Sequence, residues 1–394
     1  MSNESPFLIF KIECPVCKTI NEFEQIKVGA YVEGDRDTDF CPKDIQWRFS
    51  KYQAYNPLVF FTAMCSNCYY TREFTTKYRE WKTDNAFRSF QLKTIKAKHL
   101  EQFSVAGSIV RRLGEAIDVS RYPNESAILK MHLAIFDGLQ CDHPSYLDLG
   151  RFYLRIAWVF RTLNQGADPN MTTLTGLIRD IEIKAAQSEN TASELQGSHD
   201  QLAAAIRTQY GVQNLTADLQ SQMLGFRDRW DAQVESVNEL IGQIRGSQVL
   251  GRQLLQEYRE TILGGAGGQG QQAFREFASL SDFLVRLQPS WSGIVANERE
   301  ALEQAIRYYK EAFEGARDIS AGNQQIQASY LIAELSRRIG DFDGARQYFT
   351  STIKAGQDFI YQNRTDPSRT QLARKILELA IEQGRVNLKA SKAE

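Results

Sequence analysis

Two Cys-x-x-Cys pairs are the residues of this chain whose type and spacing point most directly to chemistry. Cys14 and Cys17 lie in ECPVCKTI, and Cys65 and Cys68 lie in MCSNCYYT. A two-residue gap lets both sulfurs of a tight turn face one ion, and two such turns complete a tetrahedral Zn²⁺ shell. The spacing therefore predicts a single structural zinc ion, bound by Cys14, Cys17, Cys65 and Cys68.

Other roles for these cysteines stay open at this point. A redox Cys-x-x-Cys pair is expected to open a helix within a βαβ unit, and no such unit is apparent around either pair. The four residues can also be unrelated buried cysteines. Cys41, in DFCPKD, can replace one of the four ligands or be a spectator, and a spectator role is favoured. Cys141 beside His143 lacks further ligands nearby and is expected at a loop or helix end.

The predicted zinc ion is expected to be structural, because four thiolates leave no open coordination position for water. Asp35, Asp37 and Asp39 begin like a calcium loop, but the sixth position is Phe40 instead of glycine. We expect a polar turn here, and Asp37 and Asp39 can in addition organise the cysteine module through hydrogen bonds. The sequence has no phosphate-loop, His-Glu-x-x-His or Gly-x-Ser-x-Gly motif, which favours a non-enzymatic protein.

Short apolar segments rich in aromatic residues lead into both cysteine pairs. FLIFKIE precedes the first pair and LVFFTAM precedes the second, and this composition favours strands. Residues 1–82 are therefore expected to fold as a small β-rich, zinc-ribbon-like module. A module of this size would draw much of its folding free energy from the ion.

After Trp81 the pattern changes to apolar residues at three- and four-residue spacing, which predicts helices over 85–118, 125–139 and 146–163. Residues 83–163 are thus expected to be the first part of a helical body.

Residues 297–394 are expected to be the second part of this body. Gly340 is suited to end one helix in a left-handed conformation. Phe342, Ala345 and Phe349 then form the apolar face of the next helix. This arrangement resembles the helix-turn-helix of tetratricopeptide repeats.

The intervening residues 164–296 differ in composition from what precedes them. They contain one lysine, Lys184, whereas the first 163 residues contain eleven. Apolar residues recur every three or four positions as one stripe of a long helix: Leu219, Met223, Phe226, Trp230, Val234, Val237, Ile241 and Ile244. We expect residues 164–296 to be a helical, coiled-coil-like insertion that contains the flexible glycine-rich linker 264–270 and splits a hairpin of 146–163 and 297–316. Its residues 172–263 are a candidate surface for homo-oligomerisation.

Charge and hydropathy narrow the cellular setting. The formal net charge is −1, which gives no overall attraction to nucleic acid or membrane. The sequence lacks an apolar stretch of about 18 residues that would span a membrane, and Lys11 breaks the N-terminal apolar run, so we expect a cytoplasmic protein with reduced thiols. Residues 72–112 carry ten positive and four negative side chains, which leaves nucleic-acid binding as an alternative to a charged helix face.

Several segments together resemble an uncharacterised bacterial family, a domain of unknown function. They are CPVC, GDRDTDF, YNPLVFFTAMCSNC, LRIAWVFR and YLIAELSRRIGDFDGARQYF, in that order. The resemblance covers about residues 7–163 and 297–360, and it implies a cysteine-pair module joined to tetratricopeptide-like helices. The family's cysteine motif corresponds to Cys14, Cys17, Cys65 and Cys68, and its acidic motif to Asp37 and Asp39. Tyr69 departs from the pattern, because a glycine usually follows the fourth cysteine.

The expected protein is therefore mainly α, with a β-rich zinc-ribbon-like module followed by a tetratricopeptide-like body. Stacked helical hairpins present an extended surface for peptides or proteins, so we expect a non-enzymatic scaffold or adaptor for protein partners. The alternative is a nucleic-acid-associated factor that uses the zinc module and residues 72–112.

Overall fold

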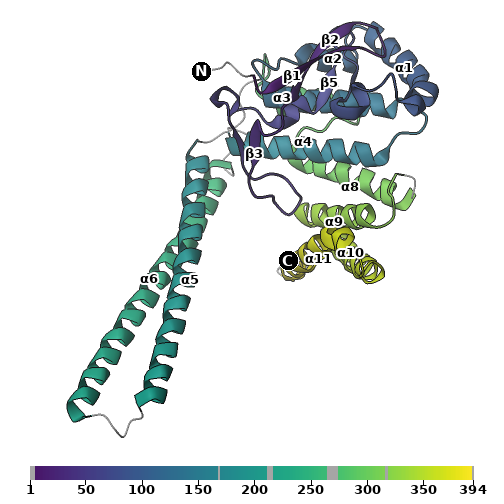
Figure 1. Ribbon diagram of the computed structural model, residues 1–394. Coiled ribbons are helices and arrows are strands. Elements are labelled where there is room, and N and C mark those ends of the chain that lie inside the picture. Colours follow the sequence, from purple (N-terminus) through teal and green to yellow (C-terminus); the bar gives the residue numbers. More distant parts are fainter. Residues whose placement is uncertain (1–4, 167–168, 211–215, 264–273, 316–317, 393–394) are drawn as a thin grey trace. The chain divides into compact units, whose positions relative to one another are not determined.

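The computed structural model describes residues 5–166, 169–210, 216–263, 274–315 and 318–392 (Figure 1). It confirms a mainly helical protein with a small β-rich region at the N-terminus. The chain divides into two compact units: residues 1–163 with 272–394 form unit 1, and residues 164–271 form unit 2. The β-rich region and the helical body both belong to unit 1. None of the described helices combines the length and apolarity needed to cross a lipid bilayer.

The β-rich region consists of short antiparallel ribbons. The strands are β1 (Phe7–Glu13), β2 (Ile20–Ile26), β3 (Tyr31–Glu33), β4 (Ile45–Trp47), β5 (Thr62–Met64) and β6 (Thr71–Glu73). β1 pairs with β2, β3 with β4, and β5 with β6. The cysteine pairs lie at the ends of two ribbons, because Cys14 follows β1 and Cys65 follows β5.

The strand expected over LVFFTAM is only partly present. Residues 57–60 form a helical turn, η2 (Pro57–Phe60), and the strand is confined to β5. Pro57 supplies a backbone angle suited to the first helical position, and the Asn56 side chain accepts a hydrogen bond from the Leu58 N–H. This cap outweighs the β preference of the apolar residues that follow.

The helices account for most of the described chain. They are α1 (Leu92–Ser104), α2 (Ile109–Ala116), α3 (Pro123–Leu139), α4 (Tyr146–Gly166), α5 (Pro169–Tyr210), α6 (Ala217–Leu263), α7 (Leu280–Val285), α8 (Glu298–Gly315), α9 (Asn323–Arg338), α10 (Phe342–Gln362) and α11 (Pro367–Ala390), with shorter turns η1 (Ser50–Tyr52), η3 (Phe74–Tyr78) and η4 (Phe87–Gln91). Between α1 and α2 the chain turns at Gly107, whose φ is +75°. Ser108 then caps α2 by accepting from the Arg111 N–H.

Helices α4 and α8 are antiparallel neighbours in the core of unit 1. Near the start of α4, the Tyr153 ring stacks on Tyr308 with centroids 5.5 Å apart. Near its end, Arg161 forms an ion pair with Glu298, the first residue of α8, at 2.7 Å. The end of α4 and the beginning of α8 therefore lie together, although 131 residues separate Gly166 from Glu298 in the printed sequence.

The boundary predicted for the insertion, residue 296, is wrong. Unit 2 ends at residue 271, and residues 274–296 belong to unit 1. Phe283, Leu284 and Leu287 lie in the same apolar cluster as α3, α4 and α8. The low lysine content therefore continues past the end of unit 2 and does not mark its boundary. The predicted linker 264–270 lies outside the described residues.

The last three helices, α9 to α11, pack on one another. Gly340 follows α9 with a φ of +88°, which confirms the predicted left-handed helix end. Ala345 and Phe349 on α10 are buried against α9 and α11, together with Tyr330 and Ile376. The small Ala345 side chain allows the helices to approach closely at this point.

Unit 2 is a hairpin of two long helices, α5 and α6, which run side by side (Figure 1). Arg245 on α6 forms an ion pair with Glu189 on α5 at 2.6 Å. The His199 and Trp230 rings stack with centroids 5.7 Å apart. These contacts pair later residues of α6 with earlier residues of α5, so the helices are antiparallel.

Candidate metal centre

The structure brings four cysteine sulfurs together in the N-terminal region of unit 1. The Sγ atoms of Cys14, Cys17, Cys65 and Cys68 all lie within 4.8 Å of one another. Cys14 and Cys68 are 3.8 Å apart, and Cys17 and Cys65 are 3.5 Å apart. A tetrahedral metal centre with metal–sulfur bonds of about 2.3 Å needs sulfurs roughly 3.8 Å apart. The four sulfurs can therefore surround one metal ion with little movement.

Each cysteine pair lies in a turn of the same construction. The Cys14 N–H donates to Thr19 and its carbonyl accepts from the Lys18 N–H, at 2.8 and 3.1 Å. The second turn repeats these two bonds, from Cys65 to Tyr70 and from Tyr69 to Cys65, both at 2.9 Å. The residue after each pair is left-handed, with a φ of 69° at Lys18 and 64° at Tyr69. The turns are thus equivalent although neither has the glycine that this conformation favours.

Tyr69, in a left-handed conformation that favours glycine, is accommodated by a glycine elsewhere in the chain. A Cβ atom at Gly114, on α2, would lie 2.2 Å from the Tyr69 ring. The ring thus packs directly on the helix backbone, and it also meets the edge of Phe103 with centroids 5.8 Å apart. This packing offsets the conformational cost of a left-handed tyrosine, about 1–2 kcal/mol.

Asn21, a buried residue on β2, connects the two cysteine turns. Its Nδ2 donates to the Thr19 carbonyl at 2.9 Å and lies 3.5 Å from the Cys65 sulfur, to which it also donates. Its Oδ1 accepts from the N–H and the hydroxyl of Ser66, at 2.8 and 2.9 Å. One amide side chain therefore holds both turns in position and stabilises negative charge on one sulfur.

His99 and Asp137 support the second turn from the helical side. The His99 Nε2 lies 2.8 Å from the Cys68 carbonyl, and its Nδ1 lies 2.6 Å from the Asp137 carboxylate. Asp137 also accepts from the Thr71 N–H, at 2.9 Å. Both neighbours of the imidazole are acceptors, so a doubly protonated ring satisfies both. Burial opposes the charged form, but the Asp137 carboxylate outweighs it, and the pKa of His99 is raised.

Sequence patterns did not point to Asn21, His99 or Asp137 as parts of the site. For His99 a signal was present, because it lies one turn after the buried Ile95 and so on the apolar face of α1. Asn21 and Asp137 carry no comparable local signal, because their partners are distant in sequence.

The donor set suits a soft divalent cation. Hydrogen bonding to Cys65 raises the pKa of the Cys14 thiol to about 12. Hydrogen bonds from Cys14 and then Cys68 hold the pKa of Cys65 below its usual range. Without a metal ion, some of the four cysteines therefore remain protonated and hydrogen-bond to the others. A bound cation would allow all four to be thiolates. The residues present fit a metal ion with four thiolate ligands.

Cys41 and Cys141, the other cysteines considered, lie outside the four-sulfur cluster. The Cys141 thiol donates to the Gly138 carbonyl at 2.9 Å, just after α3, as expected for a helix end. Cys41 lies in the loop of residues 34–44, between β3 and β4, and its thiol faces the Pro42 carbonyl at 3.6 Å. We call residues 34–44 the acidic loop.

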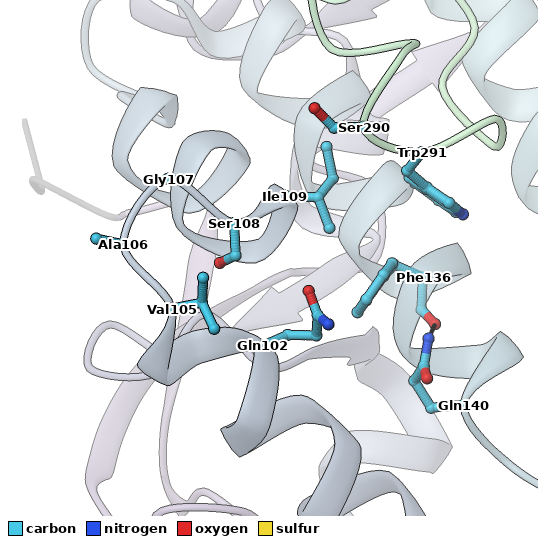
Figure 2. Close-up of a pocket in the computed structure, with 10 residues that line it drawn as sticks. All are labelled: Gln102, Val105, Ala106, Gly107, Ser108, Ile109, Phe136, Gln140, Ser290 and Trp291. Carbon is cyan, nitrogen blue, oxygen red and sulfur yellow. Dashed lines mark hydrogen bonds between the residues drawn. The ribbon is translucent and has the colours of Figure 1, made fainter.

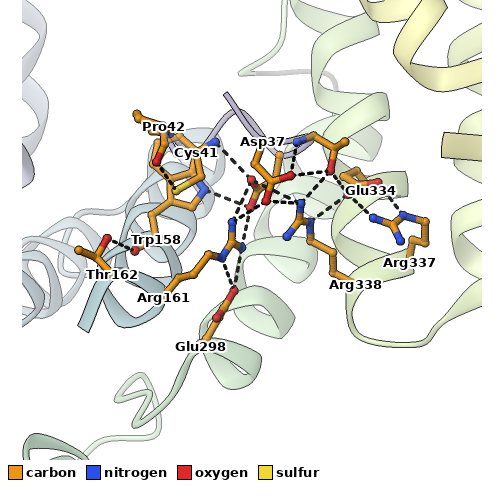
Figure 3. Close-up of polar contacts among 12 residues, drawn as sticks. Asp37, Cys41, Pro42, Trp158, Arg161, Thr162, Glu298, Glu334, Arg337 and Arg338 are labelled. Carbon is orange, nitrogen blue, oxygen red and sulfur yellow. Dashed lines mark hydrogen bonds and ion pairs between the residues drawn. The ribbon is translucent and has the colours of Figure 1, made fainter. Parts of the chain in front are cut away.

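Asp37 and Asp39 were candidates for organising the cysteine turns. The acidic loop that carries them instead binds the helical body (Figure 3). Asp39 is fully buried and pairs with Arg161 on α4 at 2.8 Å. Asp37 pairs with Arg338 on α9, also at 2.8 Å.

Further contacts extend this ion network. Arg338 also binds the buried Glu334 at 2.9 Å, while the Tyr330 hydroxyl donates to the Thr38 carbonyl at 2.8 Å. Burial raises the pKa of Asp37, but Arg338 outweighs it, so the net pKa is lowered and the carboxylate stays charged. The network joins α4, α8 and α9 through a loop that comes from the β-rich region.

Much of the positive charge in residues 72–112 is already engaged. Arg72 pairs with Asp84, Lys77 with Asp148, and Lys82 with Glu13. Within the described part of the chain, Lys93 and Lys96 on α1 form neither a hydrogen bond nor an ion pair, and Phe90 is exposed nearby in sequence. Fewer basic side chains are therefore available to bind nucleic acid than the ten in residues 72–112.

A separate hollow of about 380 Å³ lies between α1, α2, α3 and the loop at Trp291 (Figure 2). Its lining includes Gln102, Phe136 and Gln140, and it has no acidic, basic or thiol side chain. This hollow provides no titratable group for acid–base chemistry.

A protein-family model matches the parts of the chain that carry the cysteine turns, the acidic loop and the helical body. The model described as "Uncharacterized protein conserved in bacteria (DUF2225)" matches residues 9–196 and 284–374. These ranges include both cysteine pairs, the acidic loop and helices α8 to α10. No curated protein and no solved structure matches the chain. Since the match covers more than half of the sequence, the chain belongs to this uncharacterised bacterial family.

Proposed function

We propose that the protein is a non-enzymatic, zinc-binding scaffold that binds a protein partner through its C-terminal helices. Zinc binding is supported by the convergence of four cysteine sulfurs within 4.8 Å of one another. Zinc prefers four thiolates in closed structural sites, and such a site has no position left for a substrate. The ion's role is then to hold the β-rich region together. The proposal requires a reducing compartment such as the cytoplasm.

A groove between α10 and α11 supports the protein-binding part of the proposal. It has a volume of about 470 Å³. Its apolar lining includes Ile360, Leu377 and Ile381, and Tyr361 at its edge is 71% exposed. Consecutive helices α9, α10 and α11, with a glycine helix end and a small Ala345 contact, are the features that suggest a tetratricopeptide-like body. In such bodies, grooves between helices accept peptides.

The charges at the groove indicate the chemistry of the partner. Arg364 and Arg374 line it together with one acid, Glu378. A complementary peptide presents aliphatic side chains to Ile360 and Leu377 and a carboxylate to the arginines. The proposed ligand is therefore an apolar peptide segment flanked by acidic residues.

Affinity purification of the native protein, followed by mass spectrometry, tests the groove. Tyr361→Glu places a negative charge at its edge, and because Tyr361 is exposed the fold should be unaffected. Leu388→Glu is the matched control, because Leu388 is also exposed on α11, at 46%, but does not line the groove. The proposal expects a protein retained by wild type and by Leu388→Glu and lost with Tyr361→Glu. Identical captured sets for all three would refute the groove as the binding surface.

The second candidate function is nucleic-acid binding by α1. The exposed Phe90 and the unpaired Lys93 and Lys96 favour it, since exposed aromatic rings and lysines bind bases and phosphates. Binding of this kind weakens steeply with added salt, whereas a packed protein interface does not. Titration of single-stranded RNA at two salt concentrations, with Lys93→Glu as the variant, separates the two functions.

A further inference from the structure

Unit 2 carries an apolar surface on α6 that its partner helix α5 does not cover. Leu219, Phe226, Val237 and Leu240 are 45%, 54%, 38% and 57% exposed. In contrast, Ile241 on the same helix is buried, and Trp230 stacks on His199 of α5. The apolar stripe of α6 is thus wider than the contact within the hairpin. We call Leu219, Phe226, Val237 and Leu240 the open face.

The two helices contribute unequally to their contact. The residues of α5 that face inward include Ala185, which is buried, and the half-buried Ser188 and Ala192. Those of α6 are large, such as Trp230 and Ile241. Small inward side chains at these positions of α5 cover only a narrow strip of its neighbour, so the nearby Val237 and Leu240 stay outside the contact.

The acidic residues in the middle of α6 lie away from the open face, whereas Arg229 lies at its edge. At 3.6 residues per turn the four apolar residues fall within an arc of about 60°. The acidic residues of this part of the helix lie on the opposite side: Asp228, Asp231, Glu235 and Glu239. Uncharged Gln222 and Gln233 lie within or beside the open face. Protein interfaces are depleted of Asp and Glu but enriched in Arg, so this distribution fits an interface.

The apolar residues of this stripe are spaced symmetrically about one point of α6. Positions 219 and 244, 223 and 240, and 226 and 237 are each placed symmetrically about a point between residues 231 and 232. All six residues are apolar: Leu219, Met223, Phe226, Val237, Leu240 and Ile244. An antiparallel copy of α6 would therefore place an apolar side chain opposite each of them. Such a two-fold arrangement is the usual geometry of a homodimer.

We propose that a second copy of this chain covers the open face, so that two α5–α6 hairpins form an antiparallel four-helix bundle with α6 against α6. At roughly 100 Å² for each half-exposed side chain, the open faces of two copies supply about 800 Å² of apolar area, and flanking residues bring the total toward the ~1,200 Å² of the smaller stable interfaces. The family match omits residues 197–283, which contain all of α6, so this surface is argued from this chain alone. The inference is independent of the zinc and groove proposals.

Light scattering coupled to size-exclusion chromatography tests the proposal on the full-length protein. Wild type should be a dimer at micromolar concentration, and Phe226→Glu should be a monomer with unchanged helix content by circular dichroism. Val249→Glu is the matched control: Val249 is 56% exposed on the same helix but lies about 120° from the open face, so this variant should stay dimeric. A monomeric wild type, or a dimeric Phe226→Glu variant, would overturn the proposal.

A distance measurement between spin labels tests whether the two α6 helices are antiparallel. With a spin label on a Ser221→Cys variant, the antiparallel bundle separates the two labels along the helix axis by about 30 Å, since 21 residues at 1.5 Å rise lie between symmetric positions. A parallel pair would bring them within about 15 Å, and such a short distance would contradict the arrangement. Unsubstituted protein carried through the same labelling reaction is the control for the native cysteines.

Discussion

At the scale of single residues, the metal centre depends on side chains that do not bind metal. Tyr69 adopts a left-handed conformation that a glycine would adopt more readily, and it does so beside Gly114. The spacing of the cysteines was sufficient to predict that four sulfurs converge. The contact of Tyr69 with Gly114 was not predictable, because the two residues are far apart in sequence and neither belongs to a local pattern.

Gly114→Ala should loosen the second cysteine turn. The added methyl group meets the Tyr69 ring, and overpacking of this kind costs about 1–3 kcal/mol. We expect a lower melting temperature and faster loss of metal to a chelator. Gly138→Ala on α3 is the control, because its methyl group meets only the end of Leu149 at 3.4 Å. Equal rates of metal loss from the two variants would argue against the proposed role of Tyr69.

His132 should make stability depend on pH in a defined window. Its Nδ1 contacts the Ile128 carbonyl at 2.9 Å, and its Nε2 accepts from the Val295 N–H at 3.1 Å, so the buried ring is neutral. Burial lowers its pKa to about 4, below the unfolded value of about 6.5. The stability it contributes is therefore fully present above pH 6.5 and is lost as the pH falls toward 4, by about 3 kcal/mol.

Urea unfolding of wild type and His132→Gln between pH 4 and pH 7 checks this prediction. The cysteine centre also loses metal in acid, so the informative quantity is the difference in free energy of unfolding between the two proteins. That difference should shrink as the pH falls. A difference independent of pH would mean that His132 does not titrate in this window.

At the scale of elements, periodicity and helix-end signals predicted the helices reliably. The sequence did not predict which parts of the chain pack against each other. The predicted helices correspond to α1 to α4, and Gly340 ends α9 as expected. Residues 58–60 were predicted as strand because the apolar run LVFFTAM was read without the Asn56 cap. The acidic loop was assigned to the cysteine module because sequence proximity was the sole guide, whereas its arginine partners lie on α4 and α9.

Asp39→Ala should detach the acidic loop from the helical body. It leaves Arg161 half-paired in a buried site, and removing one partner of a buried ion pair typically costs 3–5 kcal/mol. We expect a clear fall in melting temperature and faster proteolysis within residues 34–44. Asp35→Ala is the control, since Asp35 is exposed in the same loop. Matching melting curves for both variants would show that the network contributes little.

At the scale of the whole molecule, the chain is two units, and unit 1 is formed by segments on both sides of unit 2. The change of lysine content marked where unit 2 begins but not where it ends. Residues 274–296 are also lysine-poor although they belong to unit 1, so lysine content alone does not report domain membership.

Two deletions distinguish the observed boundary from the predicted one. Replacing residues 164–271 with a short Gly/Ser linker should give a protein that melts cooperatively and keeps its metal. Replacing residues 164–296 should not, because it removes Leu280, Phe283, Leu284 and Leu287 from the core. Calorimetry of both products decides this, and an unfolded shorter deletion would mean that unit 2 is required for unit 1 to fold.

The metal content of the purified protein tests the central claim most directly. Elemental analysis should find close to one zinc ion for each chain, because the chain provides one cluster of four converging sulfurs within its described residues. The Cys14, Cys17, Cys65 and Cys68 quadruple serine variant should contain almost none, while a Cys41→Ser variant should match wild type. Full zinc content in the quadruple variant would contradict the account, and so would wild-type protein that contains iron in place of zinc.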